Sequence, residues 1–161
     1  MAKKAKKVSK AAKIRLVKAA EALENFSDNA ALGDVLNITE TYKIKKDASP
    51  LTFNLIFKTK GVGAVTNGVL HDALTDIDTP VVTNAKDSIR GQLIETDLVA
   101  NRKFLNIHSV IAATNLTSVP ADLDAQFSIS GGVKEVIFPI PGASFNEVGD
   151  QVILDISIFF F

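Results

Sequence analysis

Apolar and polar side chains alternate along most of this chain, and that alternation restricts the possible folds more than any other feature. The pattern starts near residue 34 and is regular in residues 36–44 and 51–57. A strand points successive side chains to opposite faces of a sheet, whereas a helix would spread the same residues around its circumference. The sequence therefore predicts strands with one apolar face. The apolar positions of the second run are Leu51, Phe53, Leu55 and Phe57.

Six later runs have the same strand-like composition, and Gly, Pro, Asn and Asp residues separate them. About eight strands in about 130 residues, with no convincing helical pattern between them, are typical of a mainly β protein. We predict an antiparallel, jelly-roll-like β-sandwich over residues 34–161, with a loop or a short helical turn at residues 70–80. The six runs are residues 64–70, 80–83, 88–98, 103–114, 125–140 and 151–161.

The alternation also predicts which side chains form the core. In the runs at residues 36–44, 51–57 and 151–161, apolar side chains recur at alternate positions and so share one face, which gains free energy by leaving water. The other face of most runs is polar, so it is expected to meet solvent. The predicted core includes Phe53, Leu55, Phe57, Phe127, Ile129, Val152, Leu154 and Ile156.

The last run, QVILDISIFFF, differs because its second face is also partly apolar. That face contains Ile153, Phe159 and Phe161. Exposed phenylalanines forfeit the free energy of burial and favour aggregation. Either an N-terminal helix or a loop covers this face, or another subunit does. We predict a subunit interface at Ile153, Phe159 and Phe161, with the intramolecular cover as the alternative.

Positive charge is concentrated at the N-terminus. The first eighteen residues hold eight basic side chains and no acidic one, and the remainder carries 10 basic against 18 acidic residues, a net charge of −8. Apolar residues three and four apart in residues 8–24 predict an amphipathic helix. Residues 1–33 are therefore expected to form a basic arm with a helix, joined to an acidic body.

The arm predicts binding to a polyanion. Lysine and arginine neutralise phosphates without reading a base sequence, so the expected partner is nucleic acid or an anionic membrane surface. The arm has no aromatic residue for stacking on bases. A solubilising tail, or a helix packed on its own protein, remains an alternative. The predicted polyanion-binding residues are Lys3, Lys4, Lys6, Lys7, Lys10, Lys13, Arg15 and Lys18.

Catalytic chemistry is not indicated anywhere in the sequence. The chain has no cysteine and no tryptophan. His71 begins an acidic segment, residues 71–78, that lacks the spacing of a calcium loop, so a solvated acidic loop is predicted there. His108 falls on an apolar strand face and is predicted to be a partly buried structural residue. The glycines of residues 61–68 indicate a turn or bulge. We predict no enzyme activity, no cofactor and no metal.

A basic arm, a short helix and a single sandwich with an apolar final strand together resemble small viral and phage capsid-type single jelly-roll proteins. The resemblance is architectural and covers the whole chain, although this arm is short and contains one arginine. It implies a self-assembling capsid or penton-type component of a virion. In that family the arm faces packaged nucleic acid or an internal membrane. The implied partners are copies of the chain or other shell proteins.

Two other classes of protein fit the same features. One is a monomeric β-sandwich module that binds a ligand or glycan. The other is a peripheral membrane protein anchored by the basic helix. In either case a cytoplasmic location is expected, because the sequence shows neither a signal peptide nor an apolar run of about 18 residues.

Overall fold

Strands make up most of residues 34–161, which are the residues that this computed structural model describes. One short helix, α2 (Asp97–Ala100), lies among them. The strands are β1 (Val35–Tyr42), β2 (Pro50–Phe57), β3 (Val62–Asp72), β4 (Ile77–Lys86), β5 (Ile89–Thr96), β6 (Phe104–Ala113), β7 (Ala121–Asp122), β8 (Ala125–Ser130), β9 (Val136–Phe138), β10 (Ser144–Phe145) and β11 (Gln151–Phe160). The prediction of a mainly β protein is confirmed. The division at residue 33 stays a prediction, because the residues before it lie outside the described part.

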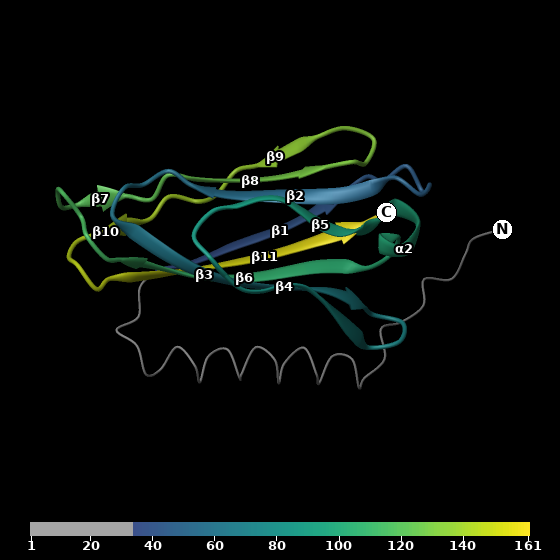
Figure 1. The fold of residues 1–161 in the computed structure, drawn as a ribbon, viewed down its shortest axis with the longest axis horizontal. Helices are drawn as coiled ribbons and strands as arrows, with labels where there is room; N and C mark the ends of the chain where they lie inside the picture. The colour runs from purple at the N-terminus through teal and green to yellow at the C-terminus, as the bar shows by residue number, and fades with distance from the viewer. Residues whose placement is uncertain (1–33) are drawn as a thin grey trace. The chain divides into compact units, whose positions relative to one another are not determined.

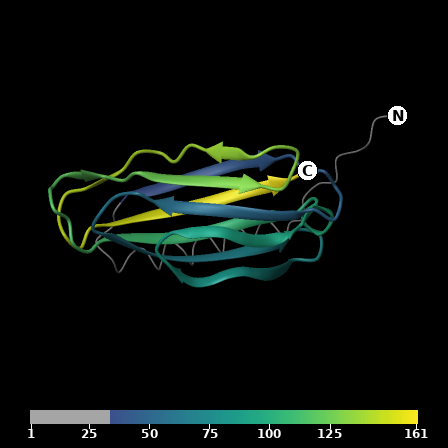
Figure 2. The ribbon, with the colours of Figure 1, turned by 45° about the horizontal axis from the view of Figure 1, so that its top comes forward.

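The strands form two larger sheets and one small one. The five-stranded sheet has the order β1-β11-β6-β3-β4, and the four-stranded sheet has the order β5-β2-β8-β9. Strands β7 and β10 pair with each other. Figures 1 and 2 show the two larger sheets as separate layers whose strands run along the length of the molecule.

The parallel pair β1–β11 contradicts the expectation of purely antiparallel pairing. Val35 lies opposite Ile153, and the register continues without a shift to Tyr42 and Phe160. All other strand pairs are antiparallel. Strands β1 and β11 stand at opposite ends of the described sequence, so no hairpin fixes their relative direction. Because the chain passes through all the other strands between β1 and β11, these two strands can pair in parallel.

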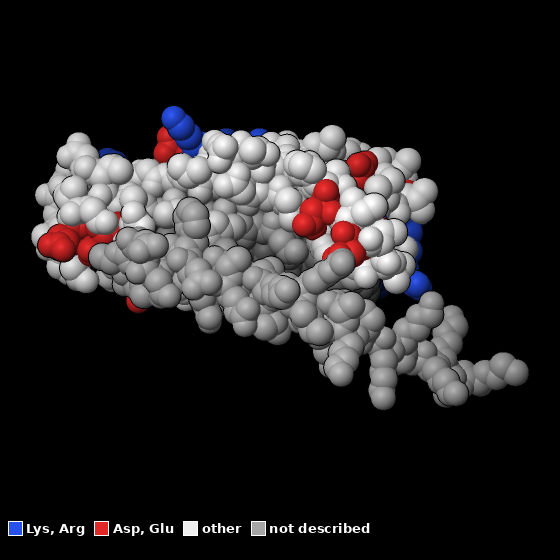
Figure 3. Space-filling view, turned by 90° about the horizontal axis from the view of Figure 1, so that it is seen from below, with Lys and Arg blue, Asp and Glu red and all other residues white. Residues whose placement is uncertain are grey.

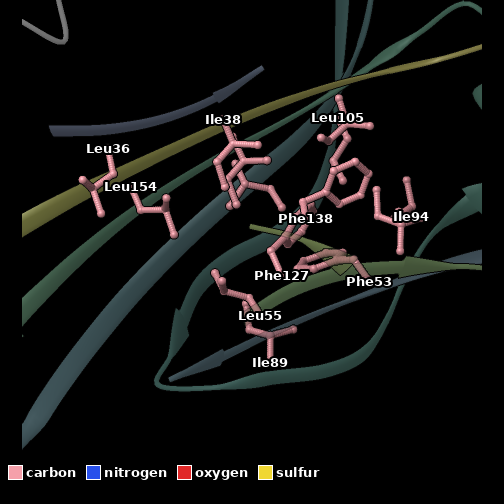
Figure 4. Packing of buried hydrophobic residues seen from close by; sticks show 14 of the residues in the cluster. Leu36, Ile38, Phe53, Leu55, Ile89, Ile94, Leu105, Phe127, Phe138 and Leu154 are labelled. Carbon is pink, nitrogen blue, oxygen red and sulfur yellow. The ribbon is translucent and has the colours of Figure 1, made fainter. Parts of the chain in front are cut away.

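One core lies between the two larger sheets. In Figure 4, Leu36, Ile38, Leu105 and Leu154 of the five-stranded sheet lie around Phe127 and its neighbours of the other sheet. Seven of the eight predicted core residues are buried, and Phe57 is the exception. Phe57 is the last residue of β2, where the sheet ends, and it is only partly buried.

The segment at residues 70–80 is a hairpin, not the predicted loop or helical turn. Strand β3 continues to Asp72 and β4 begins at Ile77, with turn residues between them. The predicted strand at 80–83 is therefore the middle of a longer one. None of its residues is fully buried, so its sequence shows no regular alternation, and the β3–β4 register shifts on both sides of Gly68. This shift and the turn at Gly61, whose φ is 79°, confirm the predicted turn or bulge at residues 61–68.

Helix α2 corrects a second boundary. The sequence placed residues 88–98 in one strand and expected no further helix, but β5 ends at Thr96. Asp97 is fully buried, and its Oδ2 accepts a hydrogen bond from the Lys45 amide at 2.8 Å. The Asp97 amide in turn donates to the Ser49 carbonyl at 2.8 Å. These bonds turn the chain away from the strand direction.

The basic arm and its predicted helix lie outside the described residues. In the part of the chain from residue 34 onward, no helix is both long enough and apolar enough to cross a membrane.

Candidate interaction surface

The outer face of the five-stranded sheet carries apolar, hydrogen-bonded polar and aromatic side chains next to one another. In β6 and β11 every second residue is buried in the core, and the residues between them are only half-buried. The register of the strands places these outward residues in rows that run across the sheet. We call this surface the outer face, and its rows are made by β1, β11, β6 and β3.

An apolar row crosses four strands of the outer face. Val35 lies opposite Ile153, Ile153 opposite Val110, and Val110 opposite Val65. Val35 is 49% exposed and Val65 is 43% exposed, although β-branched side chains gain by burial. Ile153, the first predicted interface residue, therefore lies in the middle of a continuous apolar row.

The next row is polar and tightly hydrogen-bonded. His108 Nδ1 lies 2.6 Å from Asp155 Oδ1 across β6 and β11. In the following row, the Ser157 hydroxyl donates to Asn106 Oδ1 at 2.8 Å. His108 is partly buried, as predicted, while its structural role stays a prediction. The sequence analysis missed its partner, although Asp155 is the one charged residue between apolar neighbours in the last strand.

Aromatic rings occupy the C-terminal end of the outer face. The rings of Phe159 and Phe104 are 4.9 Å apart between centroids, and Phe159 is half-buried. Phe161 is 44% exposed. Its amide donates to the Tyr42 carbonyl, and its carbonyl accepts from the Ile44 amide, so it lies opposite Lys43 in the register. The structure thus places all three predicted interface residues on one face.

Basic side chains gather beside these rings, a feature that the sequence analysis did not foresee. The amide of Arg102 donates to the Phe160 carbonyl, which places the residues before β6 next to the end of β11. We call this group the basic end; four members are exposed and Lys103 is half-buried. Figure 3 shows blue Lys and Arg atoms at the right-hand edge of the described residues, with red Asp and Glu atoms nearby. The basic end consists of Lys43, Lys45, Lys46, Arg102 and Lys103.

The acidic segment around His71 forms the β3–β4 turn. Asp72 Oδ1 accepts hydrogen bonds from the amides of Leu74 and Thr75, at 2.9 and 3.4 Å. The hydrogen bond from the Leu74 amide is the main reason that the pKa of Asp72 lies below its usual value. His71 Nδ1 lies 2.8 Å from Asp78 Oδ1. Among residues 34–161, no three His, Cys, Asp or Glu side chains form a group that could hold a metal ion.

The predicted polyanion-binding residues, from Lys3 to Lys18, lie outside the described residues. The described surface offers apolar contact, hydrogen bonding and a group of basic side chains, of which Lys103 Nζ lies 3.9 Å from Asp72 Oδ2. These properties suit recognition of another macromolecule.

Comparison of the chain with protein-family models, with curated proteins and with solved structures gives no match in any of the three.

Proposed function

We propose that this protein is a self-assembling structural protein, a capsid or penton-type component of a virion. Copies pack through the outer face, and the basic N-terminal arm meets nucleic acid or an internal membrane. The proposal rests mainly on the apolar row Val35–Ile153–Val110–Val65, because contiguous apolar side chains on a sheet face offer a surface through which copies can pack.

The arrangement of the two sheets supports this proposal. Strand β2 pairs with β8 in one sheet, while β3 and β6, which lie between them in the sequence, pair in the other. Such nested pairs wind the chain around a single core, as expected for a jelly-roll-like β-sandwich. The parallel β1–β11 pair and the β3–β4 hairpin within one sheet are variations on that plan. A sandwich of this kind leaves its outer faces and edges free to contact neighbours.

The charge distribution supports the proposed role of the arm. Eight basic residues in the first eighteen precede a body with a net charge of −8. Such a chain can attract a polyanion at one end while its body stays repelled from it. The virion location and the choice between nucleic acid and membrane belong to the same proposal.

Native mass measurement of the full chain tests self-assembly. We expect discrete particles far larger than the 17.2 kDa chain, and Val65→Glu should shift them toward the single chain. Ile137→Glu is a matched control, because Ile137 is 59% exposed on β9 of the other sheet. A 17.2 kDa particle at high protein concentration would instead support the monomeric ligand- or glycan-binding module.

Salt titration tests the arm. The full chain and a version without residues 1–18 are compared for binding to single-stranded DNA, RNA and anionic liposomes. Each engaged Lys or Arg should add about 0.7–0.9 to the log–log salt slope for nucleic acid. Preference for liposomes would support the peripheral membrane protein, and equal negligible binding by both versions would reduce the arm to a solubilising tail. Binding that remains after the deletion measures the basic end.

A further inference from the structure

The five-stranded sheet has one edge, strand β1, whose outward backbone groups meet no strand among residues 34–161. The Asp34 carbonyl bonds to Ile153 of β11, and the Tyr42 carbonyl and the Ile44 amide bond to Phe161, the residue that follows β11. Asp34, Tyr42 and Ile44 are even-numbered residues, and a parallel ladder uses alternate residues of each strand. The amides and carbonyls of the odd-numbered residues therefore face away from β11. They belong to Val35, Asn37, Thr39 and Thr41.

The other three edges of the two larger sheets carry features that hinder pairing with another strand. Strand β4 contains Pro80, and its register with β3 shifts on both sides of Gly68. Strand β5 shifts register twice against β2 and contains Gly91 with a φ of 58°. Strand β9 has three residues. Proline, bulges and short length are the usual means by which proteins prevent edge-to-edge association.

Strand β1 has none of these features. It is eight residues long, contains neither proline nor glycine, and keeps one register with β11 throughout. Its single charged residue is Glu40. A long, regular and unpaired edge is a template for one more strand.

We propose that β1 pairs antiparallel with β1 of a second copy around a two-fold axis at Thr39, so that two five-stranded sheets become one ten-stranded sheet. The inference rests on the proposed function in that both need copies to associate. It names a separate contact, because edge pairing uses the backbone of β1, whereas the outer face uses side chains.

Two features determine the register of this pair: the backbone groups of β1 that face away from β11, and the positions of Glu40 and Asp34. Centring the pair on Thr39 puts Asn37 opposite the second copy's Thr41 and uses every free outward amide and carbonyl of residues 37–41. It also puts Glu40 opposite Ile38. Shifting the axis to Asn37 would place Glu40 opposite Asp34, and like charges directly opposite each other destabilise a sheet.

A shift of the axis toward the end of β1 is also unfavourable. The carbonyl of Lys43 already accepts a hydrogen bond from the Val133 amide at 3.1 Å. A register centred on Thr41 would direct a partner strand at Lys43 and the loop beyond it. Thr39 is the middle of the free stretch, and threonine pairs across strands are favourable.

Single-cysteine variants of the full chain test this register, because the natural chain has no cysteine. Across a two-fold axis, the Thr39→Cys residues of two copies would lie at a Cα separation of about 5.5 Å, within the disulfide range. Thr41→Cys is the matched control, since it lies on the same strand face and is also exposed. Two such residues would be about 13 Å apart, too far for a disulfide.

Under mild oxidation we expect a disulfide-linked dimer of Thr39→Cys, none of Thr41→Cys, and a mixed dimer when Asn37→Cys and Thr41→Cys are combined. Cross-linking of Thr39→Cys that is no faster than that of Thr41→Cys would overturn the edge pairing. Assembly of the unmodified chain in the same experiment would then leave the proposed function standing. An unmodified chain that stays single at all concentrations would overturn both.

Charge at the axis gives a second readout that does not depend on oxidation. Thr39→Asp meets itself across the axis, so dimerisation should weaken by about two- to fivefold, as should that of Thr39→Lys. A mixture of the two should dimerise more tightly than either alone. Equal affinities for the mixture and the two pure variants would contradict the two-fold register. Thermal unfolding of each variant shows that the fold is intact, since Thr39 is exposed.

Discussion

The inner and outer faces of the five-stranded sheet share the same strands and yet carry very different side chains. On the inner face, Leu105, Ile111, Leu154 and Ile158 are fully buried. On the outer face of the same two strands, apolar, hydrogen-bonded and aromatic rows follow one another. The apolar side chains of the inner face gain free energy by leaving water. The half-buried side chains of the outer face instead contact one another across β6 and β11, through the His108–Asp155 and Asn106–Ser157 hydrogen bonds and the Phe104–Phe159 ring pair.

Two adjacent residues of β11 show how sharply the two faces differ. Phe159 and Phe160 are neighbours, but Phe160 is fully buried in the core and Phe159 stacks near Phe104 on the outer face. Substitutions on the inner face should change stability. Substitutions on the outer face should change association more than stability.

Leu154→Ala should have the largest effect on stability. Leu154 is fully buried between the two sheets, and its truncation removes apolar contacts and leaves a cavity, at a cost of about 2–5 kcal/mol. Denaturant unfolding measures the change. Ser157→Ala, on the outer face of the same strand, is the control and should cost less than about 1.5 kcal/mol. Similar losses for the two variants would break the distinction between the faces.

Tyr42→Phe tests a polar group on the inner face. The Tyr42 hydroxyl donates to the Lys134 carbonyl at 2.7 Å and accepts from the Gly132 amide at 3.0 Å. The Gly132 amide would lose its partner in a buried place, at a cost of about 1–3 kcal/mol. Denaturant unfolding near neutral pH gives the value. An unchanged stability would mean that this tyrosine contributes only its ring.

The stability of Tyr42→Phe should also depend on high pH differently from that of the natural chain. Burial raises the pKa of Tyr42 above 10.0, because the phenolate would lose its hydration. The folded state therefore holds this proton more tightly than the unfolded state. The contribution is fully present below pH 10 and is lost as the pH rises through the folded pKa. Tyr42→Phe should lose less stability than the natural chain in that range.

Asp155→Asn should have a smaller effect. The His108 and Asp155 side chains are 30% and 32% exposed, and partly exposed pairs contribute about 0–1 kcal/mol. Asparagine keeps an oxygen that can accept from His108 Nδ1. We expect a change in stability of less than about 1 kcal/mol by denaturant unfolding, and a clearer change in the native mass. A loss as large as that of Leu154→Ala would assign the polar row to the core.

The sequence predicts the inner face well where alternation is strict. In β11 every second residue is apolar, so local pattern alone identifies the core positions, and in β6 the same holds except for Ser109, which is buried and bonded to the Thr66 hydroxyl. Strand β4 escapes this rule, because it is an edge strand in which no residue is fully buried. Helix α2 was missed because Asp97 is held by the Lys45 amide, which lies 52 residues away. The parallel pairing of β1 depends on a strand at the other end of the chain.

The outer face could be predicted only in part. Alternation put Ile153, Phe159 and Phe161 on one side of the last strand, and the structure agrees. Their neighbours come from other strands, so the apolar row and the His108–Asp155 pair depend on registers that single-sequence patterns do not contain. The basic end depends in the same way on Arg102 lying beside Phe160.

Asp72→Asn should have the smallest effect on stability. Asp72 is the last residue of β3, at the end of the inner face. Asp72 follows the buried Leu70 by two residues, so it continues the inner side of β3, but it is a carboxylate that accepts from the turn amides. Those bonds lower its pKa from 3.8, so the unfolded state binds the proton more tightly. The stabilisation is therefore present above pH 3.8 and is lost as the pH falls through the folded pKa.

At pH 7 the asparagine oxygen can still accept from the Leu74 amide, so the natural chain and Asp72→Asn should differ little in stability. In acid the natural chain should lose stability that the variant retains, as measured by thermal unfolding between pH 2 and pH 5. Parallel acid profiles for the two chains would show that other carboxylates govern this range.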